Sequence, residues 1–262
     1  MNDLPRANKT LGQHWLTDLA TLQYICEFAD VSDTDTVLEV GPGLGTLTKH
    51  LSEHAKKVVA VEFDQKLALD LAATYANTNV TIVPDDILQY DLAQLPSEYK
   101  LVANIPYYLT SNLLRRVLES SNPPQTMVIL VQKEVAERMA AKPGAMSLLS
   151  VSVQYFCKVE LGEVVPAYLF TPPPKVDSQV IKLLLKPNLP YDREGAKAFF
   201  RVVAAGFSQR RKKLVNSISA GLGLSKQDVT EILNKLSIPI DIRPQELNEA
   251  QWRQLHEAID KS

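Results

Sequence analysis

The residues best suited to chemistry form one short stretch, Asn104-Ile105-Pro106-Tyr107, directly after the apolar run 101–103. The Asn104 amide oxygen is a hydrogen-bond acceptor. The Ile105 carbonyl is a second acceptor, held extended because a residue before proline avoids the helical region. Tyr107 adds an aromatic face on which a base could stack. This arrangement suits a planar exocyclic amine such as N6 of adenine, but chance matches to four residues are common, so other features must decide.

A glycine-rich turn, Gly41–Gly45, lies where the apolar run Thr36–Val40 passes into a helical pattern. Glycines there let the backbone approach a ligand at a helix N-terminus with exposed amides, and we expect Gly41 and Gly43 to contact a cofactor. The spacing departs from the Gly-x-Gly-x-x-Gly of dinucleotide folds, because the third glycine comes one residue early and Pro42 follows the first. The turn therefore disfavours a pyrophosphate site. A tight turn without a ligand is the alternative.

Acidic residues follow the next two apolar strands. Glu62 ends the second strand and can accept both hydroxyls of a ribose, whereas capping the following helix suits Asp64 better. Asp86 follows the third strand and could accept a hydrogen bond from an adenine amino group, with Asp85 as its more solvated rival. Together with Asn104, these residues and the glycine turn place one polar feature after each of four strands, at the edge where open α/β sheets bind ligands.

Short apolar strands alternate with helical patterns through the first two-thirds of the chain, which predicts a doubly wound α/β sheet. The expected strands are Thr36–Val40, Lys57–Glu62, Val80–Val83, Leu101–Ala103 and Thr126–Val131. The expected helices are Asp18–Ala29, Thr46–His54, Gln65–Tyr75, Ser111–Ser120 and Glu134–Ala140. Two further runs, Lys158–Val165 and Gln179–Leu185, could add an antiparallel edge.

The pattern changes at the proline-bracketed linker Lys186–Pro190. Beyond it only helical periodicity remains, in Arg193–Phe207, Arg210–Ala220, Lys226–Lys235 and Asn248–Ile259. We therefore expect two domains, an α/β domain over residues 1–187 and a small helical domain over residues 188–262.

Composition indicates an ordinary soluble globular protein, with 262 residues, 45% hydrophobic and 22% charged. No apolar run is long enough to span a bilayer, and the start lacks the layout of a secretory signal. Cys26 and Cys157 have no CxxC spacing, so we expect reduced core residues of a cytoplasmic protein. The four histidines form no metal-ligand pattern, and we expect no metal site and no membrane association.

One basic block stands out against a net charge of −2. It consists of Arg210, Arg211, Lys212 and Lys213, on a predicted helix. Such a block can contact nucleic-acid phosphates with salt-sensitive affinity. A solvated helix face is the alternative.

The glycine turn, the acidic residues and the Asn104 motif together resemble an S-adenosylmethionine-dependent adenine-N6 methyltransferase. Four further stretches narrow the resemblance to the bacterial KsgA/RsmA family of 16S rRNA adenine dimethyltransferases, over about residues 8–260: Leu11–Leu16, Val131–Arg138, Phe170–Ser178 and Phe207–Lys212. His14-Trp15 departs from the Asn-Phe most often found in the family. A cofactor contact through the His14 side chain is therefore in doubt, whereas a backbone contact would survive.

The resemblance implies S-adenosyl-L-methionine as cofactor and dimethylation of N6 of two adjacent adenosines in the 3′-terminal hairpin loop of 16S rRNA. The substrate would be the small (30S) ribosomal subunit or its precursor, with a role in subunit biogenesis, and the enzyme a monomer. Residues 1–187 would then be the methyltransferase domain and 188–262 the rRNA-binding domain. The catalytic residues would be Asn104, Ile105, Pro106 and Tyr107, and the cofactor residues His14, Leu16, Gly41, Gly43, Glu62, Asp86 and Asn104. Tyr107 and Phe170 would stack on the target base, although a core phenylalanine is an equal interpretation of Phe170.

Three other functions compete. A 23S rRNA adenine methyltransferase conferring macrolide resistance shares the glycine turn and the Asn-x-Pro-Tyr/Phe motif, but the stretches Phe170–Ser178 and Phe207–Lys212 favour the small-subunit enzyme. A ribosome-assembly factor that mainly binds, with methylation as its release signal, is compatible with the same motif. A dinucleotide-dependent oxidoreductase would need a glycine spacing that the chain lacks.

Overall fold

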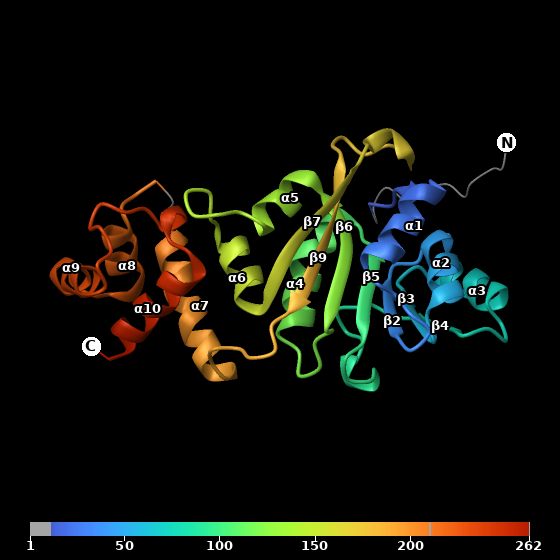
Figure 1. Ribbon diagram of the computed structural model, residues 1–262, viewed down its shortest axis with the longest axis horizontal. Helices are drawn as coiled ribbons and strands as arrows, with labels where there is room; N and C mark the ends of the chain where they lie inside the picture. The colour runs from blue at the N-terminus through green and yellow to red at the C-terminus, as the bar shows by residue number, and fades with distance from the viewer. Residues whose placement is uncertain (1–11, 210, 262) are drawn as a thin grey trace. The chain divides into compact units, whose positions relative to one another are not determined.

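The computed structural model describes residues 12–209 and 211–261 (Figure 1). The chain divides into two compact units, one made of residues up to 136 together with 158–185, and the other of residues 137–157 together with 186 onward.

A seven-stranded sheet forms the frame of the first unit, with the strand order β4-β3-β2-β5-β6-β9-β7 (Figure 1). The strands are β2 (Thr36–Val40), β3 (Lys57–Glu62), β4 (Val80–Pro84), β5 (Lys100–Asn104), β6 (Thr126–Gln132), β7 (Cys157–Val165) and β9 (Ser178–Leu185). The neighbours from β4 to β6 pair in parallel, and β9 pairs antiparallel with β6. The doubly wound α/β fold and its antiparallel addition are confirmed. The strand order reverses between β2 and β5, the place where such sheets bind ligands.

Helices flank these strands because the strands are apolar on both faces and need cover on both. They are α1 (Leu19–Phe28), α2 (Thr46–His54), α3 (Gln65–Thr74), α4 (Thr110–Leu118) and α5 (Lys133–Met139). Asp18 caps α1 by accepting the Thr21 N–H at 2.9 Å. Apolar residues of α1 and α2, among them Ile25 and Leu51, share one buried cluster with alternate residues of the strands, such as Val102.

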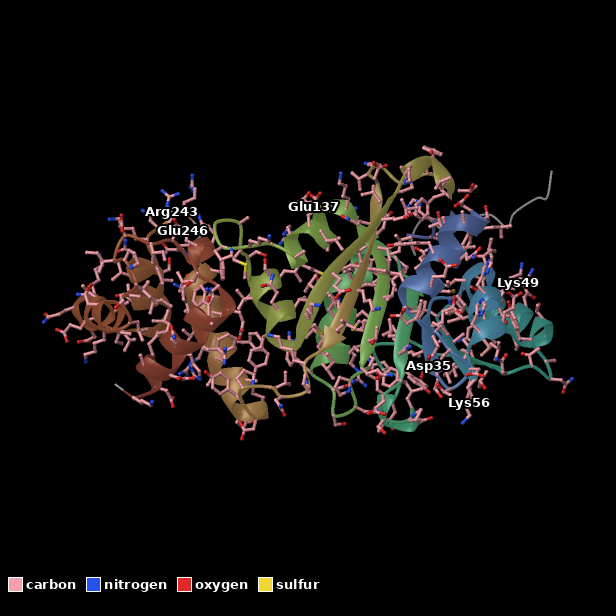
Figure 2. All side chains as sticks on the ribbon, in the orientation of Figure 1. Asp35, Lys49, Lys56, Glu137, Arg243 and Glu246 are labelled. Carbon is pink, nitrogen blue, oxygen red and sulfur yellow. The ribbon has the colours of Figure 1, made fainter. Side chains whose placement is uncertain are left out.

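An ion pair at the amino ends of β2 and β5, away from the ligand-binding edge of the sheet, joins the start of β5 to the segment that leads into β2. Asp35 (Figure 2) lies 3.0 Å from Lys100 Nζ, and each side chain is only 12% exposed. Burial acts to raise the pKa of Asp35, but hydrogen bonds from Ser32 and Lys100 outweigh it and lower the pKa. This contact fixes the starts of the two strands whose far ends carry the glycine turn and Asn104.

A separate two-stranded sheet joins the N-terminal segment to the proline-rich loop. In it β1 (Trp15–Leu16) pairs antiparallel with β8 (Phe170–Thr171), so that Trp15 faces Thr171 and Leu16 faces Phe170. The sequence did not predict these strands, since two residues are too few to show a periodicity. Two of the stretches that carry the family resemblance therefore lie side by side.

The second unit is helical, with α6 (Leu148–Phe156), α7 (Arg193–Phe207), α8 (Leu214–Leu222), α9 (Lys226–Lys235) and α10 (Glu249–Asp260). Helix α6 was not predicted. It begins at Ser147, whose side chain and that of Ser150 form a capping box, and it belongs to this unit because Tyr155 packs on Phe199 with ring centroids 5.1 Å apart. The division expected after residue 187 therefore needs a correction, because residues 137–157 group with the helical unit.

The described residues of the basic block, 211–213, do not lie within the helix predicted for them. Helix α8 begins at Leu214, with Lys213 as its N-cap in an extended conformation. Arg211 and Lys212 are exposed in the turn between α7 and α8, and Arg210 lies outside the described residues. None of the described helices is long and apolar enough to cross a membrane.

Candidate active site

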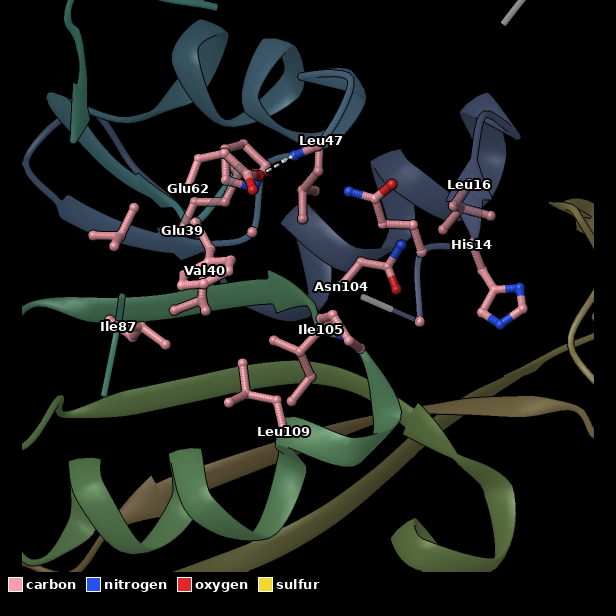
Figure 3. Close-up of a pocket in the computed structure, with 18 of the residues that line it drawn as sticks. His14, Leu16, Glu39, Val40, Leu47, Glu62, Ile87, Asn104, Ile105 and Leu109 are labelled. Carbon is pink, nitrogen blue, oxygen red and sulfur yellow. Dashed lines mark hydrogen bonds between the residues drawn. The ribbon is translucent and has the colours of Figure 1, made fainter. Parts of the chain in front are cut away.

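A single pocket of the first unit collects the features that follow β2, β3, β4 and β5 at the carboxyl edge of the sheet (Figure 3). It brings together all the residues predicted to bind the cofactor, namely His14, Leu16, Gly41, Gly43, Glu62, Asp86 and Asn104. The rest of the predicted catalytic and stacking residues also line it: Ile105, Pro106, Tyr107 and Phe170. The proximity that the sequence suggested is therefore present, while the roles of the individual residues stay predictions.

The glycine turn has the shape that only glycine adopts without strain. Gly41 and Gly43 have φ angles of +65° and +57°. A Cβ on Gly43 would come within 2.8 Å of the Trp15 ring, whereas a Cβ on Gly41 would meet nothing within 4 Å. The turn is thus packed against Trp15 on one side and open at Gly41, where a ligand can approach the backbone.

Glu62 is anchored between the turn and the next helix. Its side chain accepts the Gly43 N–H at 3.0 Å through Oε2 (Figure 3) and the Asp64 N–H at 2.8 Å through Oε1. Burial raises the pKa of the Glu62 carboxyl, and the backbone hydrogen bonds oppose that shift. Asp64, not Glu62, caps α3 by accepting the N–H groups of Lys66 and Leu67, as the sequence favoured.

Glu39 is a second buried carboxyl in the pocket lining (Figure 3), and it was not among the site residues predicted from the sequence. It is 1% exposed, and its Oε2 has no hydrogen-bond partner among the described residues. Burial raises its pKa to about 8. An acidic residue inside an otherwise apolar strand was the available signal.

This pKa predicts a pH dependence of stability. Below about pH 4.5 both the folded and the unfolded chain hold the Glu39 proton, and up to about pH 8 the folded chain still holds it while the unfolded chain has lost it. Unfolding then releases a proton, so stability falls as pH rises through this window, by at most about 1.4 kcal/mol per pH unit. We expect Glu39→Gln to remove this slope in urea unfolding at a series of pH values, and Glu163→Gln, at an exposed position, to keep it. Parallel profiles for wild type and Glu39→Gln would contradict the assignment.

Hydrogen bonds from Arg116 fix the loop that carries Asp86. Asp86 Oδ1 accepts the Leu88 N–H at 3.0 Å. The Arg116 guanidinium donates to the carbonyl oxygens of Leu88 and Tyr90, at 3.2 and 2.8 Å. Arg116 therefore positions this side of the pocket, a role that sequence alone gave no means to find.

Apolar side chains that were not predicted as site residues complete the lining. Ile87 and Leu109 contribute to it (Figure 3), and Phe63, directly after Glu62, is 57% exposed. Apolar residues are common in strand ends and loops, so the sequence does not show which of them line a pocket. Only the structure identifies these three as pocket residues.

The Asn104 motif lines the same pocket as the acidic residues. The Asn104 side chain lines the pocket and forms no hydrogen bond with another described residue. Tyr107 is fixed by a 2.7 Å hydrogen bond between its hydroxyl and Ser178 Oγ, and burial raises the pKa of that hydroxyl. Phe170 is only 3% exposed and belongs to the core cluster, so it packs in the core as well as lining the pocket.

His14 is engaged in two contacts. Its Nδ1 lies 2.7 Å from the Pro172 carbonyl oxygen, and its ring stacks on Tyr107 with centroids 5.9 Å apart and planes inclined by 24°. Because the carbonyl only accepts, Nδ1 is the donor. A cofactor contact through Nδ1 is thereby ruled out in this conformation. Within the described residues, no group of three or more His, Cys, Asp or Glu is arranged to hold a metal ion.

The fold and the pocket define a Rossmann-like methyltransferase. Residues 5–261 match the family model described as ribosomal RNA adenine dimethylase, and the chain belongs to this family. It is therefore a methyltransferase that acts on ribosomal RNA.

Individual relatives agree with this assignment. The chain is 43% identical to "Ribosomal RNA small subunit methyltransferase A" of Dehalococcoides mccartyi, over 95% of this chain and 87% of the relative. Among solved structures, a dimethyladenosine transferase from Plasmodium falciparum has a TM-score of 0.81 at 26% identity, covering 95% of this chain and 98% of that one. The 23S rRNA methyltransferase ErmE has a TM-score of 0.76 at 27% identity, covering 94% and 99%.

Proposed function

We propose that this protein uses S-adenosyl-L-methionine to dimethylate N6 of two adjacent adenosines in the 3′-terminal hairpin loop of 16S rRNA, in the small (30S) subunit or its precursor. The observation that carries the proposal is the meeting of the Asn104 motif, the glycine turn, Glu62 and Asp86 in one pocket. The small-subunit name of the relatives supports the choice of RNA. As part of the same proposal, the enzyme works as a monomer in the cytoplasm and contributes to subunit biogenesis.

The residues present fit the cofactor. Gly41 leaves the backbone open to a ligand, and Glu62 lies beside it with both carboxylate oxygens already accepting one N–H each. A carboxylate oxygen has more than one lone pair, so Glu62 can still accept the ribose hydroxyls. Asp86 would accept a hydrogen bond from the amino group of the cofactor's adenine, and Phe63 and Ile87 would offer apolar contact. When bound, S-adenosylmethionine supplies an electrophilic methyl group.

Asn104 and Ile105 would activate the target amine by orientation. The lone pair of adenine N6 is delocalised into the ring, which makes the amine a weak nucleophile. Hydrogen bonds from its two N–H groups to the Asn104 amide oxygen and the Ile105 carbonyl favour a more tetrahedral nitrogen, with its lone pair directed at the methyl group. Pro106 keeps that carbonyl extended. The proton leaves after attack, when the nitrogen is cationic, so no strong general base is needed.

Tyr107 would stack on a target adenine taken out of its own stack, and Phe170 would contribute the aromatic surface on the other side. The hydroxyl bond to Ser178 holds the Tyr107 ring in place before the RNA arrives. Phe170 is only 3% exposed, so it would contact the base through the small part of its side chain that lines the pocket.

Sequence features distinguish the proposed function from the competing ones. The structural similarity to ErmE means that the fold does not discriminate between 16S and 23S rRNA; the stretches Phe170–Ser178 and Phe207–Lys212 support 16S rRNA. An oxidoreductase is disfavoured by the glycine spacing. An assembly role is compatible with catalysis.

Calorimetry and product analysis test the reaction class. We expect S-adenosylmethionine and S-adenosylhomocysteine to bind and NAD to give no heat of binding. Incubation with methyl-labelled S-adenosylmethionine and rRNA, followed by digestion to nucleosides, should give N6,N6-dimethyladenosine. Binding of NAD, or label in another nucleoside, would reject the proposal.

Arg211 and Lys212 of the basic block should bind phosphates even though they lie in a turn and not on a helix. We expect Arg211→Gln with Lys212→Gln to weaken 30S binding and lower the slope of log affinity against log salt by about 1 to 2, since each lost phosphate contact removes close to one unit. Removal of two exposed lysines from α9, Lys226→Gln with Lys235→Gln, is the matched control with the same change in charge. An equal slope for both double variants would exclude a specific role for the block.

A further inference from the structure

Three segments far apart in sequence meet at His14. The residue directly precedes β1, its Nδ1–H donates to the Pro172 carbonyl of the proline-rich loop, and its ring stacks on Tyr107 after β5. The pairing of β1 with β8 brings the same two chain segments together one residue further on. Figure 3 shows His14 at the edge of the pocket.

Tyr107 is consequently held at two points. Its hydroxyl bonds to Ser178, which is fully buried, and one face of its ring is contacted by His14. A tyrosine ring without these contacts could change its χ angles, and each change would move the surface on which a base stacks. The ring is therefore oriented in advance of RNA binding.

We propose that His14 is a positioning residue for the target adenine: it fixes the Tyr107 ring and couples it to the proline-rich loop. The inference rests on the proposed stacking role of Tyr107. It places the His14 side chain on the RNA side of the site, whereas family resemblance alone assigned this position to the cofactor. The two contacts have different effects. The hydrogen bond to Pro172 fixes the position of the proline-rich loop, and the stacking fixes the orientation of the Tyr107 ring.

The test compares His14→Ala, His14→Asn and His14→Phe with wild type. Each is assayed for S-adenosylhomocysteine affinity and for transfer to unmethylated 30S subunits at saturating S-adenosylmethionine. For His14→Ala we expect kcat/KM for 30S to fall about 10-fold to 100-fold, because small misplacements of a reacting group have effects of this size. The affinity for S-adenosylhomocysteine should stay within about twofold. His14→Asn can keep the donor to Pro172 and His14→Phe keeps the stacking, so each should retain part of the activity.

A double-mutant cycle shows whether His14 acts by positioning Tyr107 or contributes to transfer independently of Tyr107. If His14 acts through Tyr107, His14→Ala with Tyr107→Ala should be no slower than Tyr107→Ala alone. His54→Ala, an exposed histidine of α2 outside the pocket, is the control and should behave as wild type.

The outcomes separate the inference from the function on which it rests. Normal transfer by His14→Ala together with impaired transfer by Tyr107→Ala would overturn the positioning role alone. If His14→Ala loses as much affinity for S-adenosylhomocysteine as it loses transfer activity, His14 acts in cofactor binding and the positioning role is wrong. Normal transfer by Tyr107→Ala would reject the stacking proposal itself.

Discussion

Asn104→Ala is expected to lower the rate of methyl transfer to rRNA by about 100-fold to 1,000-fold, the effect of removing one preorganised polar group from a reacting centre. The amide oxygen of Asn104 makes no hydrogen bond to any described residue, so its loss leaves no polar group of these residues without its partner. The change should therefore appear in kcat with 30S subunits. Calorimetry should show S-adenosylhomocysteine binding within a few-fold of wild type.

Two further variants sharpen this result. Asn104→Asp keeps an acceptor oxygen of the same reach, so it should retain more activity than Asn104→Ala. Asn234→Ala removes an exposed amide from α9 and should leave transfer unchanged. Wild-type turnover by Asn104→Ala would remove Asn104 from the mechanism, whatever the other variants do.

Glu62→Ala is expected to weaken S-adenosylhomocysteine binding by about 10-fold to 100-fold, because hydrogen bonds to a charged group contribute about 1.5–3 kcal/mol. The same change removes the acceptor for the N–H groups of Gly43 and Asp64. The glycine turn should therefore lose order, and the free energy of unfolding should fall by about 1–3 kcal/mol. Calorimetry and urea unfolding measure the two effects separately.

Asp64→Ala is the matched control for that experiment. It removes the N-cap of α3, which contributes about 1 kcal/mol to stability, but leaves the Glu62 carboxylate in place. We expect a stability loss with nearly normal cofactor affinity. Equal affinity losses in Asp64→Ala and Glu62→Ala would mean that the order of the segment between β3 and α3, and not the Glu62 carboxylate, determines binding.

The parts of the fold that sequence predicted well are those with strong local signals. The bounds of β2 and β3 match the prediction, as do those of α2, α7 and α9, because the apolar periodicity is strong there and, for α7 and α9, coincides with the caps Asp192 and Ser225. Helix α6 was missed because its capping box uses Ser150 where glutamate or glutamine is the usual signal, and its valines fit a strand equally well.

The candidate site was predictable where a polar residue stands at the end of an apolar strand. That rule selects Glu62, Asp86 and Asn104, and the structure places all three in one pocket. It does not select Arg116 or His14, whose roles depend on carbonyl groups and rings distant in sequence. The predicted start of α8 was wrong because arginine and lysine are good helix formers, so their presence does not show where a helix begins.

The most direct test is a competition between two RNAs for labelled methyl groups. Unmethylated 30S subunits and protein-free 23S rRNA are incubated in one reaction with the enzyme and methyl-labelled S-adenosylmethionine, then separated and digested. We expect N6,N6-dimethyladenosine from 16S rRNA alone, confined to two adjacent adenosines of its 3′-terminal hairpin loop. Label in 23S rRNA, with none in the small subunit, would contradict the proposed function.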